Sequence, residues 1–251
     1  MNEYKVKASF SKWMKEALTA FRTTEKNLTC DEVINLSGEN DYLEELLKLI
    51  YLSSHFSKIT EDLSLRFACC ISFLLKSTLF FDFTLHKNVK TLDSKLSLVY
   101  GDLYLAQGGI EFASIEGFKK ASNELKRTLK SIALSQNFES SISPGLLDYK
   151  NYKKLINLRY GSIFRLSLIT PLIFGEVKNI PKRSINFYST NAALLVSLKN
   201  NKYIEPVISA KEKSKKIGKI ESNTNKYLGE IINELRSNGW KSDSKKDQAR
   251  N

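Results

Sequence analysis

Residues that break helices are scarce in this chain, and their scarcity narrows the range of folds open to it. Only four prolines and eleven glycines occur among 251 residues. A fold of many short strands needs such residues at every turn, whereas long helices need them only near their ends. Hydrophobic residues make up 42% of the chain, which is enough to fill a core. The sequence therefore predicts an all-α, single-domain bundle of about eight or nine helices.

Hydrophobic residues recur at helical spacing along much of the chain. Positions i, i+3, i+4, i+7 and i+8 of one segment are apolar and form one helical face: Leu43, Leu46, Leu47, Ile50 and Tyr51. A largely buried helix is predicted over about 60–81, because only Lys76 interrupts its most apolar stretch. That stretch, residues 67–81, is too short to span a bilayer.

Glycine and proline mark the limits that we predict for two later helices. One helix is expected over about 92–107, where Gly108 and Gly109 follow and interrupt it. Another is expected over 149–174, with a kink at Pro171. We predict a single domain over residues 1–236. The remaining residues, 237–251, are polar and basic and are expected to form a disordered tail.

The residue types that carry out catalysis or bind metals are few. The two histidines, His55 and His86, lie at metal-ligand spacing neither from each other nor from a cysteine. Three cysteines give no disulfide framework, and the adjacent Cys69 and Cys70 are expected to be buried as small hydrophobic residues. We predict no catalytic residue, no metal site and no cofactor bound by this chain alone.

The formal charge of +12 leaves several kinds of partner open. Such a charge attracts nucleic acid, anionic lipid or an acidic protein, but it also arises from lysines spread over solvated faces. No nucleic-acid-binding motif is present, so no specific nucleic-acid partner is predicted. The start, MNEYKVKASF, has no secretory signal, so a cytoplasmic location is expected. The basic C-terminus offers peripheral contact with anionic membranes.

Three segments follow one another in a suggestive order. The first ends at Asp82 (CCISFLLKSTLFFD), the second contains Gly101 and Asp102 (KLSLVYGDLYLA), and the third contains Arg159 and Gly161 (LINLRYGSIFRL). This order resembles the trans-polyprenyl diphosphate synthase family, in which an aspartate-rich helix end precedes a "GDYLL"-like helix and a "KTG-x-L-F" helix. The resemblance spans roughly residues 40–235. It implies a helical bundle of the isoprenoid-synthase type.

The departures from the family pattern concern the metal ligands. Active members hold Mg²⁺ on the allylic diphosphate with two aspartate-rich clusters. Here Asp82 is the only carboxylate at the first position, and no aspartate occurs between Asp148 and Asp243. Arg159 stands where the family has lysine, so the resemblance leaves it as a residual diphosphate contact. Asp102 either only matches the family motif or also serves as a structural hydrogen-bonding group.

Loss of both clusters resembles the small non-catalytic subunit of two-component members, such as the heptaprenyl diphosphate synthases. The resemblance implies a heteromer with an aspartate-rich catalytic subunit that binds Mg²⁺, and a role in setting prenyl chain length for quinone side chains. Five residues of the apolar helix would then line the tunnel for the prenyl diphosphate chain or face the partner: Cys70, Phe73, Leu74, Ser77 and Phe81. Ordinary core packing is the alternative for each.

Two other functions remain open on the sequence alone. One is a divergent stand-alone prenyl or terpene enzyme, against which the missing aspartates weigh. The other is a helical protein that binds nucleic acid or a membrane surface through its basic charge, with an affinity that falls steeply with salt.

Overall fold

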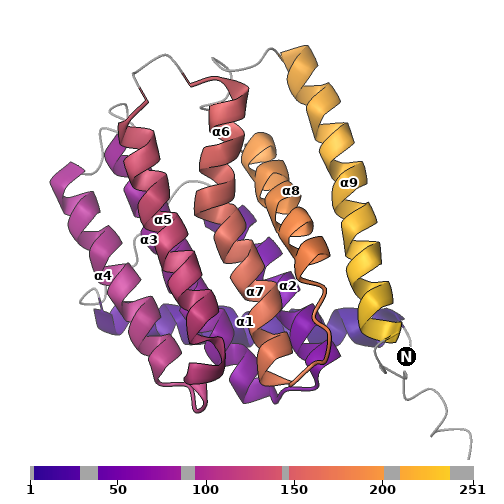
Figure 1. Ribbon diagram of the computed structural model, residues 1–251. Helices are drawn as coiled ribbons and strands as arrows, with labels where there is room; N and C mark the ends of the chain where they lie inside the picture. The colour runs from indigo at the N-terminus through magenta and orange to yellow at the C-terminus, as the bar shows by residue number, and fades with distance from the viewer. Residues whose placement is uncertain (1–2, 29–38, 86–93, 143–146, 201–209, 238–251) are drawn as a thin grey trace, which may run out of the picture.

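The computed structural model describes residues 3–28, 39–85, 94–142, 147–200 and 210–237, and the regular structure in these ranges is entirely helical. The predicted all-α class is confirmed (Figure 1). In chain order the elements are α1 (Glu3–Leu28), α2 (Glu39–Ser57), α3 (Glu61–Leu85), α4 (Ser94–Ala113), the short 3-10 helix η1 (Phe118–Ala121), α5 (Ser122–Ser140), α6 (Tyr149–Ile156), the π-helical turn η2 (Asn157–Gly161), α7 (Ser162–Phe174), α8 (Lys182–Asn200) and α9 (Ala210–Ser237).

The helices form a bundle around α3. In Figure 1, α4, α5, α6–α7, α8 and α9 run side by side, while α1 crosses behind them. Helix α3 packs against α1, α2, α4 and α7, and its contact with α4 is the most extensive in the fold. This central position explains why α3 is apolar on all sides, as the sequence predicted.

Helix α3 is long and apolar enough, over Glu61–Phe81, to match a membrane-spanning segment by length and composition. Most of that stretch is buried inside the bundle, however. Phe73, Leu74 and Phe80 have no exposed surface. Core packing therefore accounts for its composition.

The prediction that Gly108 and Gly109 end a helix was wrong, because α4 continues through both to Ala113. Gly108 lies against the side chain of Leu74 on α3, where a larger residue would collide with it. The glycine serves close packing between helices rather than termination.

The helix predicted over residues 149–174 is continuous but not uniform. Its irregular turn is η2, which contains Arg159 and Gly161, and this turn lies upstream of the expected kink at Pro171. A π-helical turn accommodates one extra residue in an α-helix and often occurs at functional sites. Apart from Ser237, the predicted tail lies outside the described residues, as does His86.

Candidate functional site

The "GDLYL" motif lies where α4 meets α3. Gly101 is buried against the ring of Phe81, and a Cβ atom at this position would overlap that ring. The Ser77 hydroxyl donates a hydrogen bond of 2.8 Å to the carbonyl oxygen of Gly101. Two turns earlier on α3 and two turns later on α4, the Cys70 thiol donates to the carbonyl oxygen of Gly108 at 3.1 Å. The glycines therefore allow the two backbones to approach closely.

The five α3 residues predicted to line a tunnel or face a partner are all buried within this chain. They pack against α1 and α4 and leave no surface on which a partner could rest in this conformation. Cys69 and Cys70 are buried free thiols, as expected. Burial raises the pKa of the Cys69 thiol to about 11 and that of Cys70 well above its usual range. A tunnel lining by these residues stays a prediction.

Of the two motif aspartates, only Asp102 has a side chain that the structure describes. Asp102 is exposed and makes no hydrogen bond to a described residue, so the structural hydrogen bond considered for it stays a prediction. It faces solvent because the opposite side of α4, with Gly101 and Tyr104, is the side that packs on α3. Asp82 lies in the last turn of α3, and its side chain is outside the described part of the structure.

Arg159 reaches α5 from the π-helical turn. Its Nε donates to the Ser135 hydroxyl at 3.2 Å, and its Nη2 forms an ion pair with Glu139. The arginine is 2% exposed, so desolvation lowers the pKa of its guanidinium. The residual diphosphate contact predicted for Arg159 stays a prediction, and it would require the guanidinium to exchange Glu139 for the ligand.

Two tyrosines fill the space beside Arg159. Tyr42 of α2 stacks on Tyr160, with ring centroids 4.3 Å apart, and its hydroxyl hydrogen-bonds to the Ser197 hydroxyl of α8. Burial raises the pKa of both phenols, which keeps them neutral and unreactive at neutral pH. The cluster joins α2, η2 and α8 in the core, so its role is to hold these elements together.

A buried charge network, which sequence reasoning missed, joins α1, α2, α3 and α4. Lys76 has no exposed surface, yet its ammonium pairs with Glu25 and lies 3.4 Å from Glu39. Arg22 bridges the same two carboxylates at 2.8 and 3.3 Å, and the Tyr104 hydroxyl donates to Glu25 at 2.8 Å. The single lysine inside an apolar stretch was the available signal, because a buried lysine requires paired carboxylates.

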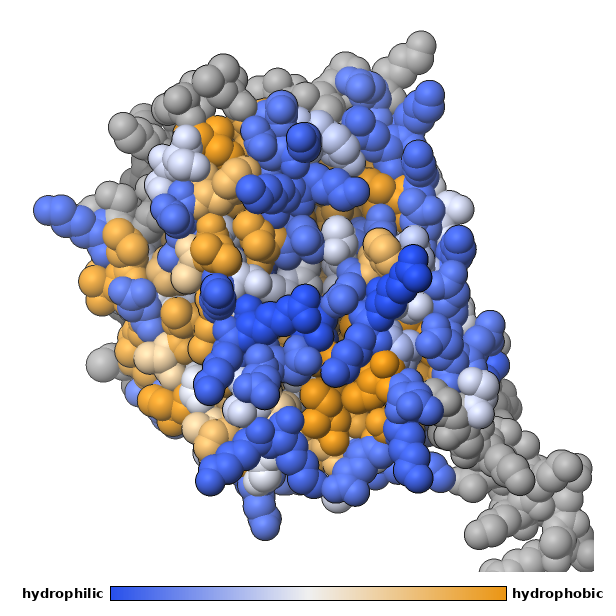
Figure 2. Space-filling view, in the orientation of Figure 1, coloured by the Kyte–Doolittle hydropathy of each residue, from blue (hydrophilic) through white to orange (hydrophobic). Residues whose placement is uncertain are grey.

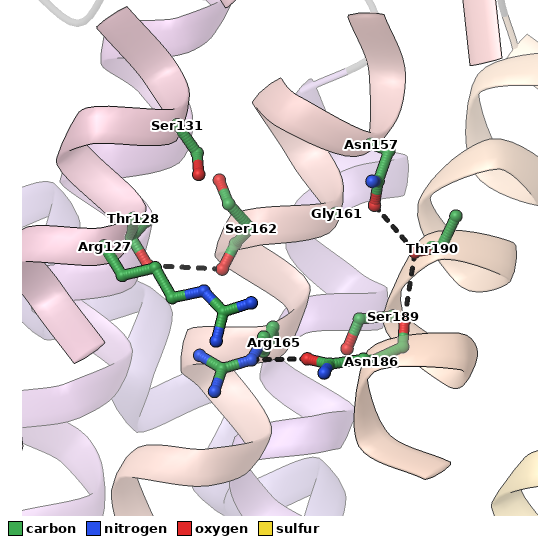
Figure 3. Close-up of a pocket in the computed structure, with 10 residues that line it drawn as sticks. All are labelled: Arg127, Thr128, Ser131, Asn157, Gly161, Ser162, Arg165, Asn186, Ser189 and Thr190. Atoms are coloured by element: carbon green, nitrogen blue, oxygen red, sulfur yellow. Dashed lines mark hydrogen bonds between the residues drawn. The ribbon is translucent and has the colours of Figure 1, made fainter. Parts of the chain in front are cut away.

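A polar pocket of about 210 Å³ lies over η2 and α7, between α5 and α8 (Figure 3). It lies among the hydrophilic residues of the face seen in Figure 2. Its walls combine two arginines with hydroxyl and amide side chains and one glycine: Arg127, Thr128, Ser131, Asn157, Gly161, Ser162, Arg165, Asn186, Ser189 and Thr190. Sequence reasoning did not find it, since its residues come from segments far apart in the chain.

The π-helical turn shapes one wall of this pocket. A Cβ atom at Gly161 would lie 2.7 Å from Oδ1 of Asn157. Without that atom, Asn157 accepts a hydrogen bond of 2.6 Å from the Thr190 hydroxyl. The glycine of the third motif thus fixes a polar wall, and no side chain of its own enters the pocket.

Several solved structures have the same arrangement of helices. An FPP/GFPP synthase from Zymomonas mobilis superposes with a TM-score of 0.61 at 10% identity, over 92% of this chain and 97% of that one. The geranyl diphosphate synthase small subunit from Antirrhinum majus gives 0.60 at 10% identity, over 88% and 93%. A heterotetrameric geranyl pyrophosphate synthase from mint gives 0.55 at 13% identity, over 91% and 93%.

The chain has the prenyl diphosphate synthase fold. The likeness covers nearly the whole of both chains in each comparison, so it extends over the complete bundle. No protein-family model and no curated protein sequence matches the chain. The structural comparisons confirm the isoprenoid-synthase type of bundle that the three motifs led us to expect.

Within this prenyl diphosphate synthase fold, no group of three or more His, Cys, Asp or Glu side chains that could hold a metal ion is found among the described residues. Four buried or partly buried carboxylates are engaged by cations: Glu25 and Glu39 by Lys76 and Arg22, Glu124 by Arg165, and Glu139 by Arg159.

Proposed function

We propose that this chain is the non-catalytic, regulatory subunit of a two-component polyprenyl diphosphate synthase. It pairs in the cytoplasm with an aspartate-rich catalytic subunit of the same fold, which binds Mg²⁺ and the prenyl diphosphate. The pair makes the prenyl chain of a quinone, and this subunit helps to set the length of that chain. The proposal rests on one surface and on the absence of one set of residues.

The surface is an apolar stripe on the outer face of α4, beside the exposed Asp102. Residues spaced by three or four positions along it are apolar, namely Leu96, Val99, Leu103, Ala106 and Ile110. Val99 is 62% exposed and Ile110 is 61% exposed. In Figure 2 hydrophobic residues line the edge of the molecule where α4 runs in Figure 1.

A helix that is apolar on two opposite faces normally has both faces covered. The inner face of α4 packs on α3 through Gly101, Tyr104 and Gly108, while the outer face has no cover from the described residues. Exposed apolar stripes of this kind are typical of protein–protein interfaces. A second helical subunit that presents a matching apolar face would cover it.

The missing residues are the aspartates of the second cluster, since none occurs between Asp148 and Asp243. A chain that lacks these Mg²⁺ ligands needs a partner to neutralise a departing diphosphate. Among the structural relatives, one is a small subunit of geranyl diphosphate synthase and another belongs to a heterotetrameric synthase. Both support a heteromer of unlike subunits for this chain.

The direct test is a prenyl transfer assay with farnesyl and isopentenyl diphosphates and Mg²⁺. The chain is assayed alone and then mixed with an aspartate-rich synthase subunit from the same organism. We expect no turnover by the isolated chain and turnover in the mixture. Turnover by the isolated chain would instead identify a stand-alone enzyme.

The surface is tested by co-purification with the same partner. Val99→Glu and Ile110→Glu place charges on the outer face of α4, and both are expected to abolish complex formation. Leu52→Glu is the matched control, because Leu52 is a 38% exposed leucine on α2. Equal loss of the complex in all three variants would show that the α4 face is not the interface.

A further inference from the structure

The polar pocket between α5, α7 and α8 carries an excess of positive charge. None of its lining residues is acidic, and two of them, Arg127 and Arg165, are arginines. Arg165 binds the carboxylate of Glu124, which does not line the pocket, through Nη1. Arg127 and Lys182 also act on Glu124 electrostatically, so three cations face one carboxylate. The imbalance favours an anion in the pocket.

The guanidinium of Arg127 has hydrogen-bond donors that no described residue uses. This group extends into the pocket in Figure 3 and makes neither a hydrogen bond nor an ion pair with a described residue. Arg165 uses Nε on Asn186 at 2.6 Å and Nη1 on Glu124, which leaves Nη2 without a described partner. Two guanidinium groups from different helices thus present donors to the same space, a geometry suited to an oxyanion.

Ser189 supplies an independent sign of a missing ligand. The side chain is 1% exposed, and its hydroxyl has no hydrogen-bond partner. Figure 3 shows Ser189 on the pocket wall formed by α8, beside Asn186. A buried hydroxyl without a partner is costly and rare, and it calls for an explanation. An acceptor bound in the pocket provides one.

The polar wall is held in place before any ligand arrives. Asn157 is fixed by the hydrogen bond from the Thr190 hydroxyl, whose oxygen also lies 3.0 Å from the carbonyl oxygen of Asn186 on α8. Gly161 leaves the room that Asn157 occupies, and both residues belong to the π-helical turn. Fixed donors lose little entropy on binding, which favours a small ligand.

We propose that this pocket binds a phosphate or diphosphate group. The volume of about 210 Å³ holds several water molecules of about 30 Å³ each, which matches a small oxyanion. No aromatic or aliphatic side chain lines it to hold a base or a hydrocarbon chain. Arginine and hydroxyl donors are the groups that bind phosphate oxygens. The site is separate from the outer face of α4 and does not depend on the proposed pairing.

Isothermal titration calorimetry tests the site with the full chain. Sodium phosphate and sodium diphosphate are the probes, and sodium chloride at equal ionic strength is the reference. We expect saturable binding of one anion per chain. Arg127→Gln should weaken this binding by about tenfold or more, because a hydrogen bond to a charged group is lost. Ser189→Ala should also weaken it while leaving the melting temperature unchanged or higher.

Lys126→Gln is the matched control, since it removes one exposed positive charge from the adjacent position on α5 without touching the pocket. Its affinity should stay within about twofold of the wild type, as surface charges at a distance contribute little. Equal losses in Arg127→Gln and Lys126→Gln would reduce the effect to general charge attraction and overturn the site. Heats no larger than those of chloride would also overturn it.

An alkyl diphosphate, compared with inorganic diphosphate, identifies the source of the group. Equal affinities mean that the pocket binds the inorganic ion or the diphosphate group alone. Tighter binding of the alkyl form means that the natural ligand is a larger phosphorylated molecule that extends out of the pocket.

Discussion

The ammonium group of Lys76 and the carboxylate of Glu25 form an ion pair from which solvent is wholly excluded, and the two residues come from α3 and α1. Glu39 and Arg22 complete the charge balance with one further acid and one further base. The network therefore fixes the position of α1 and α2 against the apolar core helix. It also explains how a lysine is accommodated inside α3.

Replacing Lys76 with methionine should destabilise the protein by roughly 3–5 kcal/mol, because two buried carboxylates would lose the ammonium that lies between them. Urea unfolding followed by circular dichroism measures the loss. The double variant Lys76→Met with Glu25→Gln should recover part of it, since one uncompensated charge is removed. Wild-type stability in the single variant would show that water or a rearranged partner replaces the ammonium.

The glycines of α4 allow an internally controlled test of close packing. Gly108→Ala should destabilise by about 1–3 kcal/mol, because its Cβ would lie 2.9 Å from the Leu74 side chain. Gly109→Ala adds the same methyl group where no atom lies within 4 Å beyond its own stretch of helix backbone, and it should stabilise the helix by up to about 1 kcal/mol. Thermal unfolding of both variants measures the contrast, and changes of the same sign would contradict the packing seen here.

The pair of Glu124 and Arg165 predicts a dependence of stability on acid. Burial opposes ionisation of Glu124, but the hydrogen bond and charge of Arg165 outweigh it and hold the pKa of the carboxyl below its usual value. The folded state therefore binds fewer protons than the unfolded chain near the ordinary glutamate pKa. Stability from this pair is present above about pH 4.5 and is lost as the pH falls further.

The Glu124→Gln variant tests this pair, because it removes the titrating group. Its stability should fall less than that of the wild type between about pH 5 and about pH 3, a range that includes the ordinary glutamate pKa. Unfolding free energies at the two pH values provide the measurement. Parallel curves for the two proteins would assign the acid sensitivity to other carboxyl groups.

The two cysteines of α3 should be inert in the folded protein. Burial raises the pKa of both thiols, so the reactive thiolate is scarce at neutral pH. The third cysteine of the chain, Cys30, is replaced with serine so that only Cys69 and Cys70 can react. In this Cys30→Ser variant, a thiol reagent such as 5,5'-dithiobis(2-nitrobenzoate) should label neither cysteine until denaturant is added. Rapid labelling without denaturant would reveal local opening between α3 and α4.

Much of the fold could be predicted because the apolar pattern is local. The face of Leu43, Leu46 and Ile50 is buried in α2, as the spacing required. The scarcity of proline and glycine indicated long helices, and the order of motifs indicated the bundle type. Gly108 misled the prediction of a helix end because its reason for being glycine is Leu74, on another helix.

The candidate sites were harder to predict, since they depend on which helices become neighbours. Ser189 and Arg127 are unremarkable polar residues in the sequence, and they share a pocket only because α5 and α8 flank α7. Lys76 can likewise be buried only because Glu25 and Glu39, on two other helices, lie beside its ammonium group. No periodicity within one segment carries that information.

The π-helical turn has a consequence for how the chain tolerates changes in length. An α-helix advances by about 100° per residue, so one deletion ordinarily rotates everything beyond it out of register. Within Asn157–Gly161 the chain already holds one residue more than an α-helix needs. A single deletion there would relax the turn to regular geometry, with the buried faces of α6 and α7 still aligned. The extra residue is thus a separable insertion, whose removal would erase the pocket wall and spare the bundle.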